Sequence, residues 1–293
     1  MVNRAKLELI ASMFIFGTIG IFVRYIPLPS SMIALVRGFI GAFFVLLFVY
    51  MKKSRLDFQM IRKHFLMLSL SGVFIGINWI LLFESYRYTT VATATLCYYM
   101  QPIFVILASP FLLKEKLTIK KLLCVAVALF GMVFVSGVME SGIPVVSEVK
   151  GILYGLGAAF FYAAVVLMNK KTVEISAYDR TITQLGTGAV VLTPYVILTQ
   201  NIVQSASFMT PLLWMLLLFV GLVHTGVAYA LYFSSMKDLK AQTIAIFSYI
   251  DPIIAIILSA LFLKEKISFF GILGAILVLG STFISEMPEK ERN

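Results

Sequence analysis

The stretch from Val91 to Lys116 is the most constraining feature of this chain, because it is repeated 150 positions later, from Ala241 to Lys266. Ten of the 26 aligned positions are identical, and both copies end in the triplet Lys-Glu-Lys. Each copy contains an apolar run of about 23 residues, long enough to cross a bilayer. A proline, Pro102 or Pro252, lies near the middle of each run. The chain is therefore expected to contain two similar membrane helices, one in each half.

The two prolines predict that these helices are bent. Proline has no N–H, so the carbonyl four residues earlier, that of Tyr98 or Ser248, loses its usual helical partner. Freed backbone groups at membrane depth are tolerated where they face protein or a water-filled space. Paired interrupted helices in two halves of a chain are typical of transporter binding sites. Pro102 and Pro252 therefore mark the expected position of such a site.

The composition excludes a soluble domain. The chain has 293 residues, of which 60% are hydrophobic and 13% charged, and its mean hydropathy is +0.98. These values are typical of a protein that crosses the membrane several times. Ten spans with short connections are predicted, near residues 7–26, 29–51, 65–87, 90–112, 119–138, 149–170, 178–199, 211–235, 240–263 and 268–286.

The positive charge follows membrane topology rather than a nucleic-acid surface. The net charge is +10, but the lysines and arginines lie in short clusters between apolar runs, so no nucleic-acid partner is expected. If the N-terminus is cytoplasmic, eighteen of these residues fall on the cytoplasmic side and five on the other, with Arg37 inside a span. The positive-inside rule therefore predicts that both termini are cytoplasmic.

The repeat continues upstream of the opening stretch, since Gly76 and Phe83 align with Gly226 and Phe233 at the same offset of 150. Each repeat then holds five spans, and because five is odd the second repeat enters the membrane from the opposite side. The predicted fold is an all-α integral membrane protein with ten transmembrane helices, in two inverted-topology five-helix repeats. Its expected parts are residues 1–140 (first repeat), 141–150 (linker), 151–286 (second repeat) and 287–293 (cytoplasmic tail).

Asp251 is the most informative polar residue within a predicted span, since ionisable groups at membrane depth are costly unless they are paired or face water. It directly precedes Pro252, and its counterpart in the first repeat is the neutral Gln101. We expect Asp251 either to bind a cationic group or a coupling proton, or to be the structural partner of a buried arginine.

Arg37 is the candidate for that partner. It lies about eight residues, or ~12 Å, from the outer end of its span, so its long side chain can reach toward Asp251. Glu84 competes for Arg37, although Glu84 can instead pair with Arg87 on the same helix. An Arg37 without a carboxylate partner would suit an anionic carboxylate substrate through a bidentate contact.

His224 lies near the middle of the eighth span, where it can serve proton coupling or form a hydrogen bond between helices. Aromatic side chains gather at the same depth, although Trp and Tyr usually prefer the ends of spans. They either only pack or offer flat apolar walls with a donor, which suits amphiphilic or quaternary-amine substrates. With Asn78 beside Trp79, the further candidates for binding are Asn78, Trp79, Tyr98, Tyr99, Gln101, Tyr162, Tyr229 and Tyr249.

Ten spans in two five-helix repeats, each closing with a proline-centred helix, a Lys-Glu-Lys-[Leu/Ile]-[Thr/Ser] turn and a glycine-bearing last helix (Gly131, Gly280), resemble the EamA-type permeases of the drug/metabolite transporter superfamily. The resemblance covers nearly the whole chain but carries no signature for substrate. It implies a secondary transporter in the plasma membrane, with a central cavity between the halves, that exports amino acids or related metabolites.

Three alternatives to an amino-acid exporter bear on the same residues. The site would also suit an importer of a cationic or quaternary-amine metabolite, whereas a passive channel is less favoured because fused inverted repeats are typical of alternating access. An enzyme is not expected, since the chain has two isolated histidines and no zinc, Walker or dinucleotide-binding motif. The expected partners are a small-molecule substrate and the lipid bilayer, with no metal or cofactor; proton coupling and oligomeric state stay open.

Overall fold

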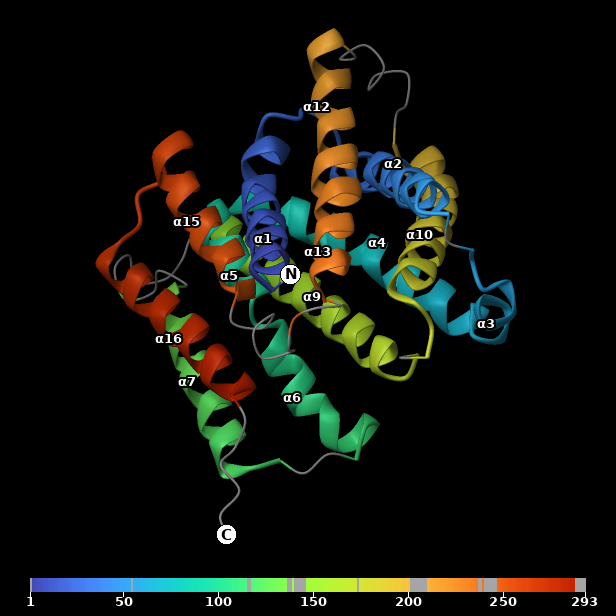
Figure 1. Ribbon diagram of the computed structural model, residues 1–293. Helices are drawn as coiled ribbons and strands as arrows, with labels where there is room; N and C mark the ends of the chain where they lie inside the picture. Colours follow the sequence, from blue (N-terminus) through green and yellow to red (C-terminus); the bar gives the residue numbers. More distant parts are fainter. Residues whose placement is uncertain are drawn as a thin grey trace.

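The computed structural model describes residues 2–53, 55–114, 117–135, 139, 146–172, 174–200, 210–236, 239 and 247–287. Within these ranges the chain is helical and contains no strand (Figure 1). The helices are α1 (Val2–Arg24), α2 (Ser30–Met51), α3 (Phe58–Lys63), α4 (Phe65–Tyr88), α5 (Val91–Tyr98), α6 (Gln101–Leu112), α7 (Ile119–Val135), α9 (Val146–Lys170), α10 (Ala177–Thr199), α12 (Pro211–Gly221), the π-helix η1 (Leu222–Val227), α13 (Ala228–Met236), α15 (Ile250–Phe262) and α16 (Phe269–Glu286).

Seven of the described helical segments are long and apolar enough to cross a membrane, when α5 with α6, and α12 with η1 and α13, are each taken as one segment. The shorter apolar helices α7, α15 and α16 have 17, 13 and 18 residues. An all-helical, multi-pass membrane protein is therefore confirmed. The first part of the span expected at 240–263, half of the expected linker (141–145) and nearly all of the expected tail lie outside the described residues. The other half of the expected linker, 146–150, is the first part of α9.

Side-chain caps explain where several helices begin. A Ser, Thr or Asp side chain that accepts a backbone N–H of the first turn satisfies a donor that would otherwise lack a partner. This contact fixes the entry angle of each helix. The capping residues are Asp57 for α3, Thr90 for α5, Ser176 for α10, Thr210 for α12 and Ser268 for α16.

Both proline-centred segments are interrupted just before their proline. Helix α5 ends at Tyr98, and α6 begins with Pro102 in its first turn. Helix α15 likewise begins with Pro252 in its first turn. The residues at the two interruptions have nearly the same conformation, with φ −73°, ψ 3° at Tyr99 and φ −72°, ψ −8° at Tyr249. The described residues at the two interruptions thus have the same local backbone.

The turn that follows each copy is also alike. Lys114 and Lys264, the first residues of the two Lys-Glu-Lys triplets, both have a left-handed backbone, with φ 57° and 54°. In both copies the preceding leucine donates its N–H to the carbonyl of the serine four residues earlier, Ser109 at 2.8 Å and Ser259 at 3.1 Å. A repeated sequence therefore produces a repeated turn.

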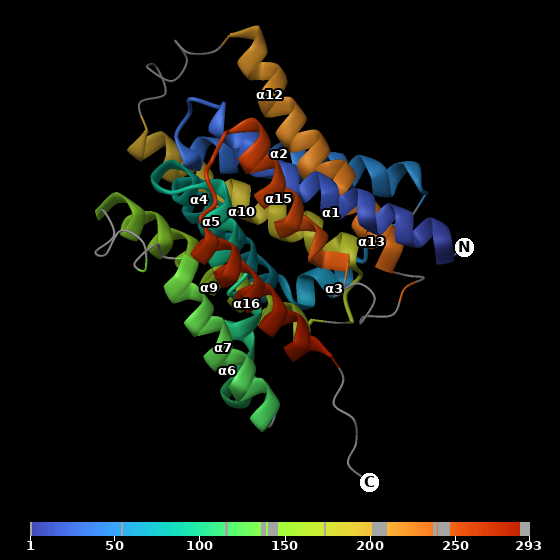
Figure 2. The same cartoon turned by 90° about the vertical axis from the view of Figure 1, so that its left-hand side faces the viewer.

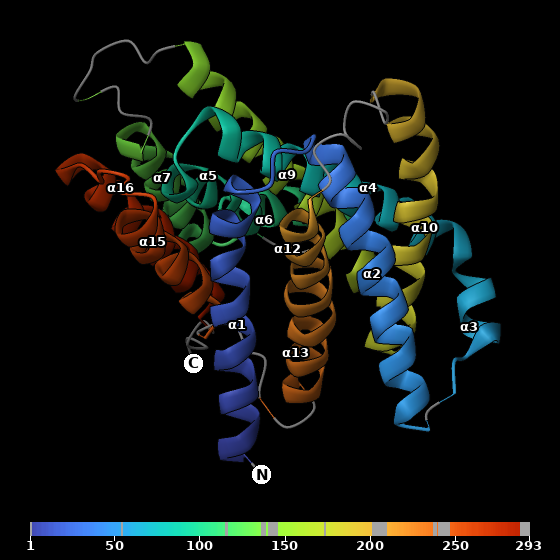
Figure 3. The same cartoon turned by 90° about the horizontal axis from the view of Figure 1, so that it is seen from above.

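The helices pack in pairs that join the two halves of the sequence. Helix α4 packs on α9 and α10, α1 on α13 and α15, and α2 on α10 and η1. Helices α7 and α16 lie side by side at one margin of the bundle, away from α2 and α10 (Figures 1 and 2). Seen from above, α1, α13 and α2 lie next to one another, and α3 lies at the far margin beyond α2 and α10 (Figure 3).

Glycines allow two of these contacts to be close. A Cβ atom at Gly188 of α10 would meet the backbone oxygen of Gly72 of α4 at 2.5 Å. A Cβ atom at Gly274 of α16 would lie 2.7 Å from the backbone oxygen of Gly131 of α7. Small residues of this kind let membrane helices approach backbone to backbone, so both pairs depend on the absence of a side chain.

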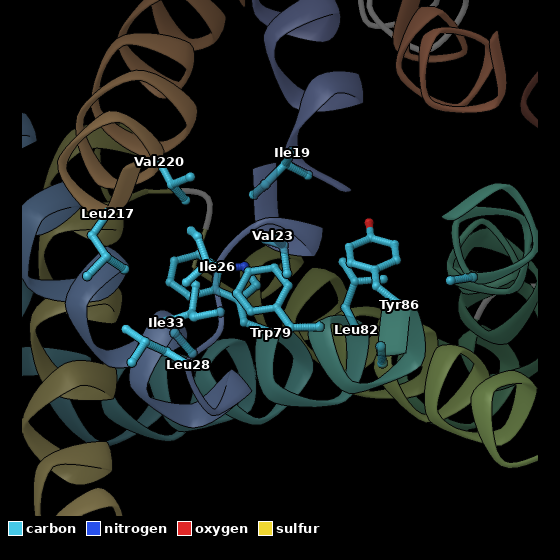
Figure 4. Close-up of a cluster of buried hydrophobic side chains, with 14 of the residues drawn as sticks. Ile19, Val23, Ile26, Leu28, Ile33, Trp79, Leu82, Tyr86, Leu217 and Val220 are labelled. Carbon is cyan, nitrogen blue, oxygen red and sulfur yellow. The ribbon is translucent and has the colours of Figure 1, made fainter. Parts of the chain in front are cut away.

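The largest apolar cluster lies between α1, α2, α4 and α12 (Figure 4). Val23 of α1, Ile33 of α2, Trp79 of α4 and Leu217 of α12 are all buried there. Close packing of this kind stabilises membrane bundles because lipid supplies no hydrophobic driving force between helices. The cluster places α4, which carries Trp79, next to α2, which carries Arg37.

Candidate functional site

Arg37 of α2 is held by two neighbours, and neither is an acid. Its Nε donates to Thr225 Oγ1 at 2.7 Å, and its guanidinium carbon lies 4.1 Å from the centre of the Trp79 ring. The side chain is buried, with 5% of the residue exposed. No carboxylate of the described residues pairs with it, and Nη1 and Nη2 donate no hydrogen bond within those residues. The guanidinium therefore keeps two donors for an anionic group.

The π-helix η1 supplies the contacts on the α12–α13 side. It brings the consecutive residues His224 and Thr225 to partners on two different helices. His224 Nε2 lies 2.8 Å from Thr18 Oγ1 of α1, and Thr225 accepts from Arg37 of α2. The His224 ring is fully buried and packs edge-on against Phe22 at 5.1 Å. Single π-turns inside α-helices are frequent at functional sites.

Asp251 lies in the first turn of α15, where its side chain interacts with Tyr99. The Tyr99 hydroxyl also donates to the carbonyl of Ser248 at 3.1 Å. That carbonyl is the one whose helical partner Pro252 removes, so a tyrosine of the first repeat satisfies a backbone group freed in the second. A helix N-terminus favours negative charge, so the first turn of α15 is a suitable place for a carboxylate.

Two tyrosines, Tyr86 and Tyr98, lie close to both Arg37 and Asp251. Tyr98 stacks on Tyr162 with ring centres 5.5 Å apart. Both Tyr86 and Tyr98 lie close enough to interact electrostatically with Arg37 and with Asp251. The two charges are thus neighbours of the same phenol groups without touching each other.

The other sequence candidates have separate roles. Asn78 donates to the Ala158 carbonyl at 2.6 Å and joins α4 to α9. Tyr249 packs against Tyr99 with ring centres 6.2 Å apart. Tyr229 packs against Phe16 at 5.5 Å. Gln101 is the first residue of α6 and is half-buried.

The sequence allowed an ion pair between Arg37 and Asp251, and this pair does not form in the structure. Arg37 binds Thr225 and stacks on Trp79, while Asp251 interacts with Tyr99. Glu84 does not bind Arg37 either, because it pairs with Arg87 at 3.4 Å. The buried arginine and the half-buried aspartate therefore have different partners.

Sequence reasoning missed three residues that complete this arrangement, namely Thr18, Tyr86 and Thr225. Threonines are frequent in membrane helices, so nothing in the sequence distinguished Thr18 or Thr225 from the others. Tyr86 lies near the end of α4, whereas the aromatic candidates from the sequence lie near the middle of their spans. Only its position on α4, seven residues after Trp79, placed it on the same helical side.

Within the described ranges no three His, Cys, Asp or Glu side chains are grouped as metal ligands would be. A surface hollow of about 570 Å³ lined by Phe58, Gln59, Arg62 and Lys63 lies on α3 and is separate from the residues above.

Long apolar helices, interrupted helices and buried charges together define a polytopic membrane transporter. The kind of transporter is given by the sequence family: the chain matches the EamA-like transporter family over residues 4–137 and 149–287. These ranges are most of its 293 residues. The chain therefore belongs to the EamA-like transporter family, and it is a transporter rather than an enzyme.

Relatives among curated proteins agree with this family. An uncharacterized transporter of Bacillus subtilis, YxxF, is 28% identical over 94% of this chain and 87% of its own length. An uncharacterized transporter of Archaeoglobus fulgidus is 25% identical over 94% of both chains. A protein of Escherichia coli named "Probable amino-acid metabolite efflux pump" is 24% identical over 66% of both. One crystal structure shares the fold, with a TM-score of 0.67 over 97% of this chain and 96% of its own, at 17% identity.

Proposed function

We propose that this chain is a secondary transporter that exports amino acids or related amphiphilic compounds across the plasma membrane by alternating access. The observation that carries the proposal is a pair of opposite charges that do not bind each other, with Arg37 buried and Asp251 half-buried. Arg37 retains donors for a carboxylate, and Asp251 has no cation from the described residues as a partner. An amino acid presents a carboxylate and an ammonium group and so complements both.

The aromatic residues support an amphiphilic solute. Tyr98 and Tyr162 form a stacked pair near both charges, and Trp79 lies against Arg37. In this assignment the substrate carboxylate binds Arg37, its ammonium binds Asp251 and its apolar part lies against the rings. His224, with its hydrogen bond to Thr18, serves as a contact between helices.

Packing supports the inverted repeat. If the two five-span units are exchanged, the α4–α9 contact corresponds to that between α13 and α1, and the α10–α4 contact to that between η1 and α2. The α1–α15 contact corresponds to that between α9 and α6. The two family matches also cover one half of the chain each. Alternating access follows if the halves exchange their conformations about the buried charges.

The proposed topology places both termini in the cytoplasm, because lysines and arginines are distributed eighteen to five in favour of that side. The ends of α1 and α15 and the start of α5 then face the outside. Export as the direction is supported by the efflux function in the name of the Escherichia coli relative.

Counterflow in proteoliposomes tests this function. Purified protein is first screened for thermal stabilisation by leucine, phenylalanine, their methyl esters and choline, since a ligand of the folded state raises the melting temperature. The compounds that bind are then tested as radiolabelled substrates. We expect saturable counterflow of an amino acid and none of its methyl ester. Flux that neither saturates nor shows counterflow would identify a channel, and preference for choline would identify a cation importer.

A further inference from the structure

The glutamate of the second Lys-Glu-Lys triplet, Glu265, is turned into the protein. Its side chain is 8% exposed, whereas Lys264 and Lys266 on either side are exposed. The left-handed backbone of Lys264, with φ 54°, forms the tight turn that allows this. The Glu265 N–H is also bound to the Ser259 carbonyl at 3.3 Å. The turn therefore holds the carboxylate in one place.

Glu265 joins three segments that are far apart in the sequence. Its two carboxylate oxygens lie 3.1 and 2.9 Å from the N–H of Val91, the first residue of α5. One of them also pairs at 3.1 Å with Arg24, the last residue of α1. Arg24 in turn donates to the Thr89 carbonyl at 3.4 Å. We call the set of Glu265, Arg24 and the Val91 N–H the Glu265 latch.

The latch lies at the opposite end of α5 from the tyrosines of the proposed site. Helix α5 has eight residues, so its first residue is roughly 12 Å from its end. That end carries Tyr98 and leads directly to Tyr99, which interacts with Asp251. With the latch formed, the α15–α16 turn is fastened to the end of α1 and to the start of α5.

We propose that the Glu265 latch is the outer gate of this transporter, which must break for the substrate site to open to the outside. Glu265 is a positioning residue in this role, because it acts through the start of α5 and does not touch the substrate. The inference rests on the proposed alternating access and outward orientation. Charge-assisted hydrogen bonds at low exposure are the stronger kind, so this contact can determine which conformation prevails.

Accessibility of a cysteine at the site tests the gate without any substrate. Tyr98→Cys is introduced as a reporter, and the native Cys97 and Cys124 are buried, so the parent protein gives the labelling background. Intact cells are treated with a membrane-impermeant trimethylammonium methanethiosulfonate reagent. Adding Glu265→Ala should raise the labelling rate of this reporter roughly tenfold, the effect of losing one hydrogen bond to a charged group.

Two further variants separate the gate from general destabilisation. Arg24→Gln removes the ion pair but keeps the bond to the Val91 N–H, so its labelling rate should rise less than that of Glu265→Ala. Glu84→Gln is the matched control, because Glu84 pairs with Arg87 within one helix and should leave the rate unchanged. Folding is checked by monodispersity in detergent. If Glu265→Ala does not fold, the Arg24→Gln rate decides the question.

Labelling equal to the Tyr98→Cys parent in the folded Glu265→Ala or, failing that, Arg24→Gln variant would overturn the gate. Labelling that increases equally in Glu84→Gln would do so as well. An increased rate seen only with reagent on the cytoplasmic side would contradict the outer position. A tenfold rise in labelling, together with no transport of any tested amino acid by the wild-type protein, would instead reject the proposed substrate and leave the gate in place.

Discussion

The two proline-centred segments have similar backbone angles next to the proline but different side chains there. Both interrupt the helix at a tyrosine of nearly identical conformation, and both are followed by a lysine with left-handed φ. The residue before the proline is Gln101 in one copy and Asp251 in the other. The duplicated part is therefore the backbone framework, and only the second copy has a charged residue directly before its proline.

The tyrosines at the interruptions show the same division. Tyr99 crosses to the second copy, where it donates to Ser248 and interacts with Asp251, whereas Tyr249 packs edge-on against Phe283. Two segments with similar backbones can thus place one asymmetric set of polar groups near the middle of the bundle. Substitutions at matching positions can therefore measure how far the two copies differ.

Asp251→Asn removes the charge that only the second copy carries. We expect substrate counterflow to fall at least about thirtyfold, because the proposed pair between Asp251 and the substrate ammonium is lost, and loss of one partner from a buried charge pair costs roughly 2–5 kcal/mol. The pH dependence of counterflow should also change. Gln101→Ala is the matched control in the first copy and should retain most of the counterflow. Wild-type affinity and pH dependence in Asp251→Asn would reduce this residue to a structural role.

Arg37→Lys keeps the positive charge but removes the planar group that lies on Trp79 and binds Thr225. We expect the affinity for amino acids to fall about tenfold, since lysine cannot form the bidentate contact with a carboxylate. The dissociation constant is measured by thermal shift or scintillation proximity. Thermal stabilisation by the methyl ester, which has no free carboxylate, should be the same in both proteins. An equal loss of affinity for acid and ester would argue against a carboxylate at Arg37.

Tyr99→Phe removes the hydroxyl that satisfies the Ser248 carbonyl. The free energy of unfolding should fall by about 1 kcal/mol, which is typical of hydrogen bonds between membrane helices. Pro252→Ala restores an N–H to that carbonyl, so in this background the cost of Tyr99→Phe should fall to about half. Unfolding in mixed SDS–detergent micelles measures all four proteins of the cycle, and strict additivity would show that the two groups do not interact.

Lys264→Gly and Lys114→Gly test the turns that follow the two copies. A left-handed backbone costs a lysine roughly 1–2 kcal/mol, part of which glycine loses again through its greater freedom in the unfolded chain. Each variant should therefore gain less than about 1 kcal/mol, and the two gains should be equal. A gain in one copy only, seen as a shift of melting temperature, would show that the turns are not equivalent.

The sequence was sufficient for the parts of the fold that depend on pattern. Apolar runs of membrane length located the long helices, and the proline spacing located the positions at which α6 and α15 begin. The family followed from the repeated Lys-Glu-Lys turn together with the number of spans. These features are local or periodic, so they can be read without knowing which helices touch.

The partners of the buried charges could not be predicted in the same way. The sequence brought Arg37 and Asp251 together as opposite charges of similar depth, but depth does not specify the direction of a side chain around its helix. Arg37 binds Thr225 of the π-helix η1 and stacks on Trp79 of α4. No periodicity in the sequence predicts the π-helix that carries Thr225.

That π-helix also has a consequence for how this chain tolerates deletions. A π-turn contains one residue more than an α-turn, so loss of one residue between Leu222 and Val227 would let the segment close into a regular α-helix. Residues from Ala228 onward would keep nearly their present orientation, because the deletion removes the one residue that the wider π-turn accommodates, and Tyr229 would stay close to Phe16. The loss would instead fall on the turn itself, from which His224 and Thr225 reach partners on α1 and α2.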